Sequence, residues 1–221
     1  MIQYSNTDTN NMLPFSIDQT ISLFDIALRT ISGGARERRP NPSKKAPPIE
    51  LSDAVKNESG RLMRINHCGE VCAQALYLGQ ALTSNEPRIR EALKKAAEEE
   101  IDHLAWCEER LEELDTKRSY LNPAFFAMSF LGGAIAGFLG NRINLGFVAA
   151  TEEQVVNHLD VHLEILPEED KLSRLILEKM REDEAKHQDF ALEQGGLDFP
   201  YSLKNLMKLA SRVMTRSTYW L

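Results

Sequence analysis

The chain has only three cysteines in 221 residues, too few for a disulfide framework or a thiolate metal site. The odd number favours free thiols in a reducing compartment. Cys68 and Cys72 lie one helical turn apart, but no second cysteine pair exists to complete a tetrahedral thiolate site. We therefore expect the cysteines to be small buried residues.

An excess of basic residues is also lacking. The net charge of −7 argues against general nucleic-acid binding, which needs a basic surface. The N-terminal apolar stretch contains Asp18, Asp25 and Arg29 and has no small-residue cleavage site, so we do not expect a signal peptide. A chain of 221 residues can form one substantial core without a second domain.

What the chain does have is one short pattern in two copies, Glu-x-x-His. Each copy follows another glutamate by about one helical hairpin, with spacings of 30 and 32 residues between the glutamates. Residues three apart share a helix face, so each Glu and His can reach the same centre. Such a set is typical of di-iron or di-manganese sites in four-helix bundles. The predicted metal ligands are Glu70, Glu100, His103, Glu152, Glu184 and His187.

The helix faces support this prediction. Glu100 and His103 interrupt an apolar stripe, and Glu152 shares a face with apolar residues, whereas its neighbour Glu153 shares one with polar residues. Burial of a carboxylate without a partner costs roughly several kcal/mol of folding free energy. A bound cation would offset this cost. The alternative is that each glutamate lies on a solvated helix face, which is the commoner situation for a single glutamate.

Hydrophobic periodicity predicts an all-α chain, with a four-helix bundle, an added N-terminal helix and a C-terminal amphipathic helix. The N-terminal region, 1–48, has a polar start, a helix over 17–31 and a basic, proline-rich linker that we expect to be extended or mobile and solvated. The bundle domain is expected over 49–221. Its helices are predicted from Ser52 or Ser59 to Thr83, over 87–114, through Glu152 to Leu166, and from about 170 to 194.

Residues 119–141 contain no charged side chain. A single membrane crossing there would separate the first two predicted ligand helices from the last two. A helix of about 16 residues also spans only about 24 Å, less than a hydrocarbon core of about 30 Å. We therefore expect this insert, about 120–145, to begin the third bundle helix or to form a hairpin that dips into one leaflet.

The last twenty residues combine apolar positions with basic residues at every fourth position and contain no acidic residue. This pattern is typical of a helix on an anionic membrane surface. The alternative is a helix packed on the bundle with its basic side in water. The four basic residues are Lys204, Lys208, Arg212 and Arg216.

Over about residues 50–221, the chain resembles the Coq7 family of demethoxyubiquinone hydroxylases. The resemblance lies in the string from Leu62 to Glu70, read as LMRINHCGE, in Thr151-Glu-Glu, and in Asp183-Glu-x-x-His187. It implies a ferritin-like di-iron monooxygenase that is peripheral on the membrane. Such enzymes hydroxylate the ring of a polyprenylated demethoxybenzoquinol in ubiquinone biosynthesis. The six predicted ligands match those of the family, without replacement.

With this resemblance, we expect two Fe²⁺ ions as cofactors and O₂ as co-substrate. Glu100 and Glu184 are expected to bridge the ions, with Glu70 and Glu152 as terminal ligands. Glu99 and Asp183 are expected to orient the histidines of the opposite hairpin. His158 is either a hydrogen-bonding partner near Glu152 or an ordinary core or surface histidine. The access path for the isoprenoid tail is expected along Phe125, Phe126, Phe130 and Phe138.

Several partners follow as expectations. Two electrons must come from the quinol, from NADH or from a redox protein, and other ubiquinone-biosynthesis proteins are candidate partners. The sequence does not decide whether the chain forms a homo-oligomer. The expected location is the cytoplasmic face of a bacterial cell membrane. The alternative functions are a soluble ferritin-like ferroxidase, a rubrerythrin-type di-iron peroxidase, and a non-catalytic membrane scaffold.

Overall fold

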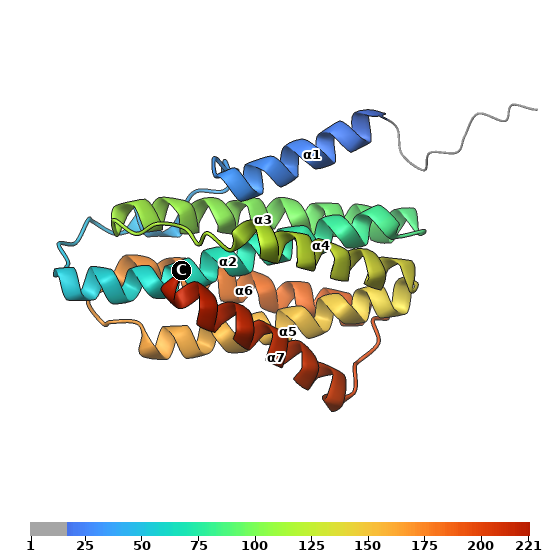
Figure 1. Ribbon diagram of the computed structural model, residues 1–221. Coiled ribbons are helices and arrows are strands. Elements are labelled where there is room, and N and C mark those ends of the chain that lie inside the picture. The colour runs from blue at the N-terminus through green and yellow to red at the C-terminus, as the bar shows by residue number, and fades with distance from the viewer. Residues whose placement is uncertain (1–16) are drawn as a thin grey trace, which may run out of the picture.

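The computed structural model describes residues 17–221, which are helical or irregular and form no strand. The polar start of the chain lies outside the described residues. The elements, labelled in Figure 1 apart from the short η1, are α1 (Ile17–Ser32), the 3-10 helix η1 (Pro42–Lys45), α2 (Asp53–Thr83), α3 (Pro87–Glu113), α4 (Asn122–Phe138), α5 (Asn141–Ile165), α6 (Lys171–Glu193) and α7 (Tyr201–Trp220).

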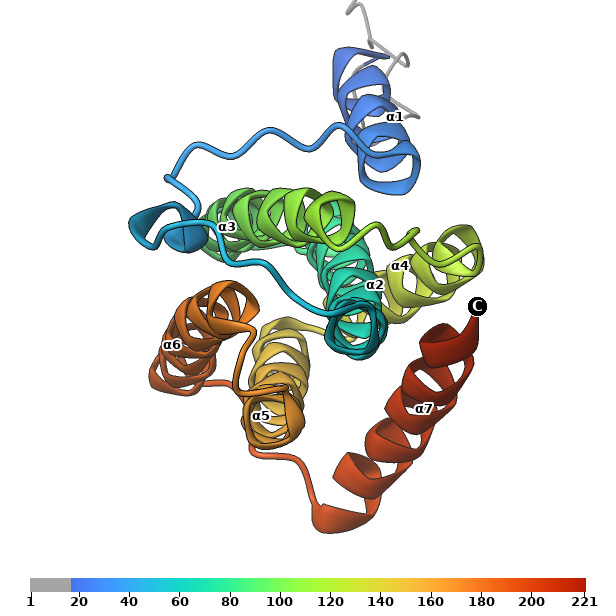
Figure 2. The ribbon, with the colours of Figure 1, turned by 90° about the vertical axis from the view of Figure 1, so that its left-hand side faces the viewer.

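Helices α2, α3, α5 and α6 form a four-helix bundle, seen along its axis in Figure 2. Helix α1 packs on α2 and α4, and α7 crosses the opposite side of the molecule on α2 and α5. The predicted all-α bundle with one added helix at each end is therefore confirmed.

Local sequence sets where the bundle helices begin. The Ser52 hydroxyl accepts the backbone N–H of Val55 at the start of α2, and the Asp170 carboxylate accepts that of Ser173 at the start of α6. Both side chains satisfy a donor that the first helical turn leaves free. The choice between Ser52 and Ser59 as the start of the first bundle helix is thereby settled in favour of Ser52.

The charge-free insert is a helix of its own, α4, of 17 residues. It ends before Gly140, whose φ of +102° favours glycine and which separates α4 from α5. Of the two alternatives expected for the insert, the one in which it begins the third bundle helix is therefore wrong, and the one in which it dips into a leaflet stays a prediction. Helix α4 lies against α2 at small residues, so close that a Cβ added to Gly133 would lie 2.2 Å from the carbonyl oxygen of Leu76.

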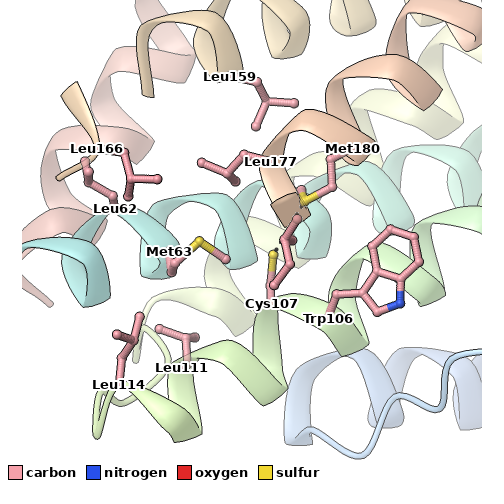
Figure 3. Close-up of a cluster of buried hydrophobic side chains, with 11 residues drawn as sticks. Leu62, Met63, Trp106, Cys107, Leu111, Leu114, Leu159, Leu166, Leu177 and Met180 are labelled. Carbon is pink, nitrogen blue, oxygen red and sulfur yellow. Dashed lines mark hydrogen bonds between the residues drawn. The ribbon is translucent and has the colours of Figure 1, made fainter. Parts of the chain in front are cut away.

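Two apolar clusters fill the bundle. The larger one, drawn in Figure 3, joins all four bundle helices and includes the buried side chains Met63, Trp106, Leu159 and Met180. The second contains Tyr77, Leu93, Ala97, Val148 and Ala191. Along every bundle helix the predicted metal ligands fall between the residues of these two clusters. The fold thus holds a short polar layer between two apolar ones.

The proline-rich linker is not the solvated segment that its composition suggests. Asn41 and Ser43 are only 4% exposed, and η1 packs against α6. Backbone and side-chain donors of the linker bind carboxylates of α3, including Asp102 and Glu109. The acidic outer surface of the bundle therefore fixes a segment that charge repulsion and proline content would otherwise keep extended.

None of the helices within residues 17–221 combines the length and the apolar character that a bilayer crossing requires.

Candidate metal centre

All six predicted ligands meet in the polar layer of the bundle. Glu70, Glu100, His103 and Glu184 can direct one ligand atom each to a common point, and so can Glu152, Glu184 and His187. Glu70 comes from α2, Glu152 from α5, and the two Glu-x-x-His pairs from α3 and α6. The carboxylate side chains are at most 3% exposed. The four helices therefore supply two adjoining sets of candidate ligands that share Glu184.

Glu100 and Glu184 each face both histidines. The two oxygens of Glu100 lie 3.2 Å from His103 Nδ1 and 3.3 Å from His187 Nδ1. Those of Glu184 lie 3.1 Å and 3.2 Å from the same two nitrogens. Ligands at right angles, about 2.1 Å from one ion, are about 3 Å apart. Two carboxylates in this arrangement would be able to bridge two ions, each of which would also bind one imidazole.

Glu70 completes the surroundings of one histidine, since one of its oxygens lies 3.5 Å from His103 Nδ1. Three carboxylates thus converge on a single ring nitrogen. One N–H can satisfy only one of them, and a buried carboxylate oxygen without a donor is costly. Among the described residues, Glu70 Oε2, Glu100 Oε1 and Glu152 Oε2 have no hydrogen-bond partner. These buried acceptors and nitrogens fit a pair of cations.

The outer nitrogen of each histidine is held by a carboxylate from the opposite hairpin. His103 Nε2 lies 3.3 Å from Asp183 Oδ2, and His187 Nε2 lies 3.2 Å from Glu99 Oε2. An Nε2–H donated to these oxygens leaves the Nδ1 lone pair directed at the centre. The structure therefore brings Glu99 and Asp183 to the positions that the sequence predicted.

One further partner of the site was not predicted. The Tyr77 hydroxyl donates a hydrogen bond of 2.6 Å to Glu152 Oε1, from inside the second apolar cluster. Burial and the nearby carboxylate raise the pKa of Tyr77 well above its ordinary value, so it remains a donor. Tyr77 follows Glu70 by two helical turns in an apolar stretch, which was the available signal.

Burial dominates the electrostatics of the centre. It raises the pKa of Glu70 and of Glu152 well above the ordinary value for glutamate. Burial also acts to raise the pKa of Glu100, but the nearby His103 and His187 outweigh it and lower that pKa. For His103, hydrogen bonds to Asp183 and to the ligand carboxylates outweigh burial and raise the pKa. The layer carries more negative charge than its histidines can balance, which again suits cations.

A large apolar cavity of about 460 Å³ adjoins the centre. It lies between α2, α4, α5 and α7, and Glu70 is the only predicted ligand on its wall. Residues of α7 such as Met207 and Met214 line it together with Phe125 of α4 and Phe147 of α5. The volume is typical of a site for an organic molecule. The part that α7 plays in this cavity was not foreseen from the sequence.

Three of the four phenylalanines expected along an access path do not line this cavity. Only Phe125 lines the cavity. Phe126 is buried in a separate cluster, Phe130 stacks on it at a centroid distance of 6.4 Å, and Phe138 is 77% exposed at the end of α4. A periodic pattern of aromatic residues could not distinguish these faces, because the contact with α2 decides which face of α4 is buried.

His158 does not bond to Glu152. Its ring lies 3.9 Å from that of His162, centroid to centroid, and it lines the apolar cavity. Glu153, the rejected candidate beside Glu152, points away from the centre and accepts a 2.6 Å hydrogen bond from Lys204 of α7. The helical phase therefore identified the glutamate that faces the centre. Of the two roles expected for His158, the one beside Glu152 is not seen.

The sequence matches the family described as "Ubiquinone biosynthesis protein COQ7" over residues 57–218. The chain belongs to the COQ7 family. The match covers most of α2, all of α3 to α6 and most of α7, so it includes all six candidate ligands and the walls of the cavity.

COQ7 relatives of nearly the same length are similar to it throughout. A protein of Chromohalobacter salexigens named 3-demethoxyubiquinol 3-hydroxylase is 56% identical over 205 residues, which are 92% of this chain and 96% of that protein. Proteins of the same name from Azotobacter vinelandii and Pseudomonas putida are 55% and 52% identical over 91% and 92% of this chain and over 94% and 95% of their own lengths.

Proposed function

We propose that this chain is a di-iron monooxygenase that hydroxylates the ring of a polyprenylated demethoxybenzoquinol, demethoxyubiquinol, in ubiquinone biosynthesis. The observation that carries the proposal is that Glu100 and Glu184 each lie between the two histidines, with one oxygen near His103 and the other near His187. The names of the similar proteins supply the substrate class. The ferroxidase and peroxidase alternatives would not need a 460 Å³ apolar cavity beside the centre.

The residues of the chain divide the work. Glu100 and Glu184 would bridge two Fe²⁺ ions, with Glu70 and His103 on one and Glu152 and His187 on the other. When bound, the ions would activate O₂ for insertion of one oxygen atom into the ring, while the second leaves as water. The two electrons required would come from the quinol itself, NADH or a redox protein. Other ubiquinone-biosynthesis proteins are proposed partners.

The cavity residues would position the quinol and keep water away. Its wall is almost wholly apolar where α4 and α7 contribute, which suits an isoprenoid tail, and Glu70 marks the end where the ring would meet the metal centre. In this arrangement the tail lies between α4 and α7. A substrate too insoluble to diffuse through water would then arrive along these two helices from a membrane.

Complementation tests this function. In a strain that accumulates demethoxyubiquinone, the wild-type chain should restore ubiquinone and Glu184→Ala should not. Glu153→Ala is the matched control. It also removes a glutamate carboxylate, but one that lies next to Glu152 in the sequence and bonds to α7 rather than facing the centre. Ubiquinone restored to the same level by Glu184→Ala would contradict the metal assignment. Failure of the wild-type chain would contradict the proposed reaction.

We further propose that the chain is a peripheral protein on the cytoplasmic face of a bacterial membrane, bound through α7 and α4. Lys208, Arg212 and Arg216 are exposed on α7 beside exposed apolar residues, and α4 exposes Leu131, Ile135 and Phe138. Lys204, the fourth basic residue of α7, is less available to a membrane, because it forms ion pairs with Glu153 and Asp198 at 2.6 and 2.8 Å.

Vesicle co-sedimentation tests the membrane proposal. Replacing Lys208, Arg212 and Arg216 by Gln should weaken binding to vesicles rich in phosphatidylserine by about 1 kcal/mol per charge, or roughly 100-fold in total. Binding to neutral vesicles should change little. Equal binding of the variant and the wild type to the anionic vesicles would exclude α7 as the contact.

A further inference from the structure

The linker before the bundle places one arginine against the metal centre. Arg39 Nη1 donates a 2.7 Å hydrogen bond to Asp183 Oδ2, and this is the same oxygen that faces His103 Nε2 at 3.3 Å. The other oxygen of Asp183 is held by Lys179 and Lys186, at 2.7 and 3.2 Å. Of these three cations, only Arg39 is bound to the oxygen that orients the histidine.

Arg39 is itself held on three sides. Its Nε donates a 2.6 Å hydrogen bond to Asp102 Oδ2, and its guanidinium lies 5.1 Å from the centre of the Trp106 ring. The Trp106 indole N–H donates to the backbone oxygen of Arg39 at 3.3 Å, and the backbone N–H of Arg38 donates to Asp102 at 2.6 Å. A guanidinium with a fixed fork and a stacked face has little freedom to move.

The two carboxylates joined by Arg39 belong to the two Glu-x-x-His helices. Asp102 precedes His103 on α3, and Asp183 precedes Glu184 on α6; both are about 4% exposed as side chains. Arg39 therefore links the two helices beside the metal centre, from a segment of chain that contributes no ligand. Within residues 17–221 the second histidine has no equivalent clamp: its partner Glu99, whose side chain is 34% exposed, forms an ion pair with His187 alone.

We propose that Arg39 is a positioning residue for the metal centre, which fixes the Asp183 carboxylate against His103 and thereby directs the imidazole Nδ1 toward the ion it would bind. The inference rests on the proposed di-iron function. It assigns to the N-terminal linker a part in the construction of the site, in addition to its packing on the bundle.

The sign of the effect separates positioning from simple electrostatics. Removal of a positive charge near a cation site should tighten cation binding through Coulomb forces alone. Loss of an oriented partner of a ligand histidine instead weakens metal binding, typically by about 10- to 100-fold. The two explanations therefore predict opposite results for the same variant.

The test is a Co²⁺ titration of the metal-free full-length chain, followed by visible absorbance and by competition with a chelator. Arg39→Ala should bind one equivalent of Co²⁺ roughly 10- to 100-fold more weakly than the wild type. Arg38→Ala is the matched control: it removes the same charge one residue away, where the side chain pairs with exposed Glu98, and it should leave the affinity unchanged.

Two more variants establish the route. In an Asp183→Asn background, Arg39→Ala should cause no further loss, because the carboxylate through which it acts has been removed. Arg39→Gln keeps most of the side-chain volume over Trp106 and serves if the alanine variant does not fold; the same weakening is expected. Unfolding of the metal-free proteins by urea checks that the folds are equally stable.

Wild-type affinity in both Arg39 variants, tighter binding, or an undiminished effect in the Asp183→Asn background would each overturn the inference. Those results leave the proposed function intact as long as the wild type binds the metal. A wild-type chain that binds no Co²⁺ or iron would instead overturn the proposed function itself.

Discussion

The close contact between α2 and α4 predicts opposite effects for two adjacent glycines. A Cβ at Gly133 would lie 2.2 Å from the Leu76 carbonyl oxygen and 3.0 Å from the Leu76 Cα. These are backbone atoms, so the two helices must separate by roughly 1 Å to accommodate the methyl group, a form of overpacking that costs about 1–3 kcal/mol. A Cβ at Gly132 would meet only a side-chain methyl of Leu76, at 3.9 Å.

The net change follows from two terms. Alanine in place of glycine within a helix is favourable by up to about 1 kcal/mol. With the full helix gain, Gly133→Ala should therefore lose up to about 2 kcal/mol of stability. For a chain of this size this lowers the Tm by up to about 8 °C. Gly132→Ala should be neutral or more stable. Because Gly132, Ser129 and Phe125 of α4 line the cavity, Gly133→Ala should also raise the KM for the quinol more than it lowers kcat.

The assay is thermal unfolding of both variants and the wild type under the same metal load, followed by steady-state kinetics. If Gly133→Ala unfolds at the same temperature as Gly132→Ala, the helices do not lie at the distance described, and the explanation of how α4 packs on α2 is wrong.

Two other predictions concern buried charge. Arg110 is 4% exposed and binds Asp170 at 2.7 Å and Ser173 at 2.9 Å. Arg110→Met leaves Asp170 buried without its cation, so it should lower the free energy of unfolding, measured in urea, by about 3–5 kcal/mol. A loss below about 1 kcal/mol would contradict this. Burial lowers the pKa of His158 to about 4 and, with His158 nearby, that of His162 to about 3. The unfolded chain therefore takes up protons first as the pH falls below 6.5, so stability should drop between pH 6.5 and about 4. Replacement of both histidines by Gln should flatten this part of the urea-derived stability profile, and an unchanged slope would show that other groups cause it.

The sequence predicted those features that one helix face can encode. Helical phase identified Glu152 rather than Glu153, and the Glu-x-x-His spacing placed Glu100 and His103 on the same face. The repeated hairpin spacing predicted that the two sets of candidate ligands meet, since both hairpins must fold into one bundle for these side chains to share a metal centre.

Features that depend on contacts between distant elements were missed. The composition of residues 35–48 indicated a solvated linker, whereas Asp102 and Asp183 bind Arg39 and fix it. The path of the chain at Gly140, which makes α4 a separate helix, depends on how closely α4 packs on α2. The same contact decides that Phe125 faces the cavity and Phe126 the core.

Metal analysis of the purified chain tests the central claim most directly. The wild type should contain about two iron ions per chain, with the Mössbauer spectrum of a coupled pair after oxidation. Glu100→Ala removes one of the two carboxylates that we propose to bridge the ions, and it should lose the coupled signal. A wild-type chain that binds no transition metal, or a coupled pair that persists in Glu100→Ala, would contradict the account.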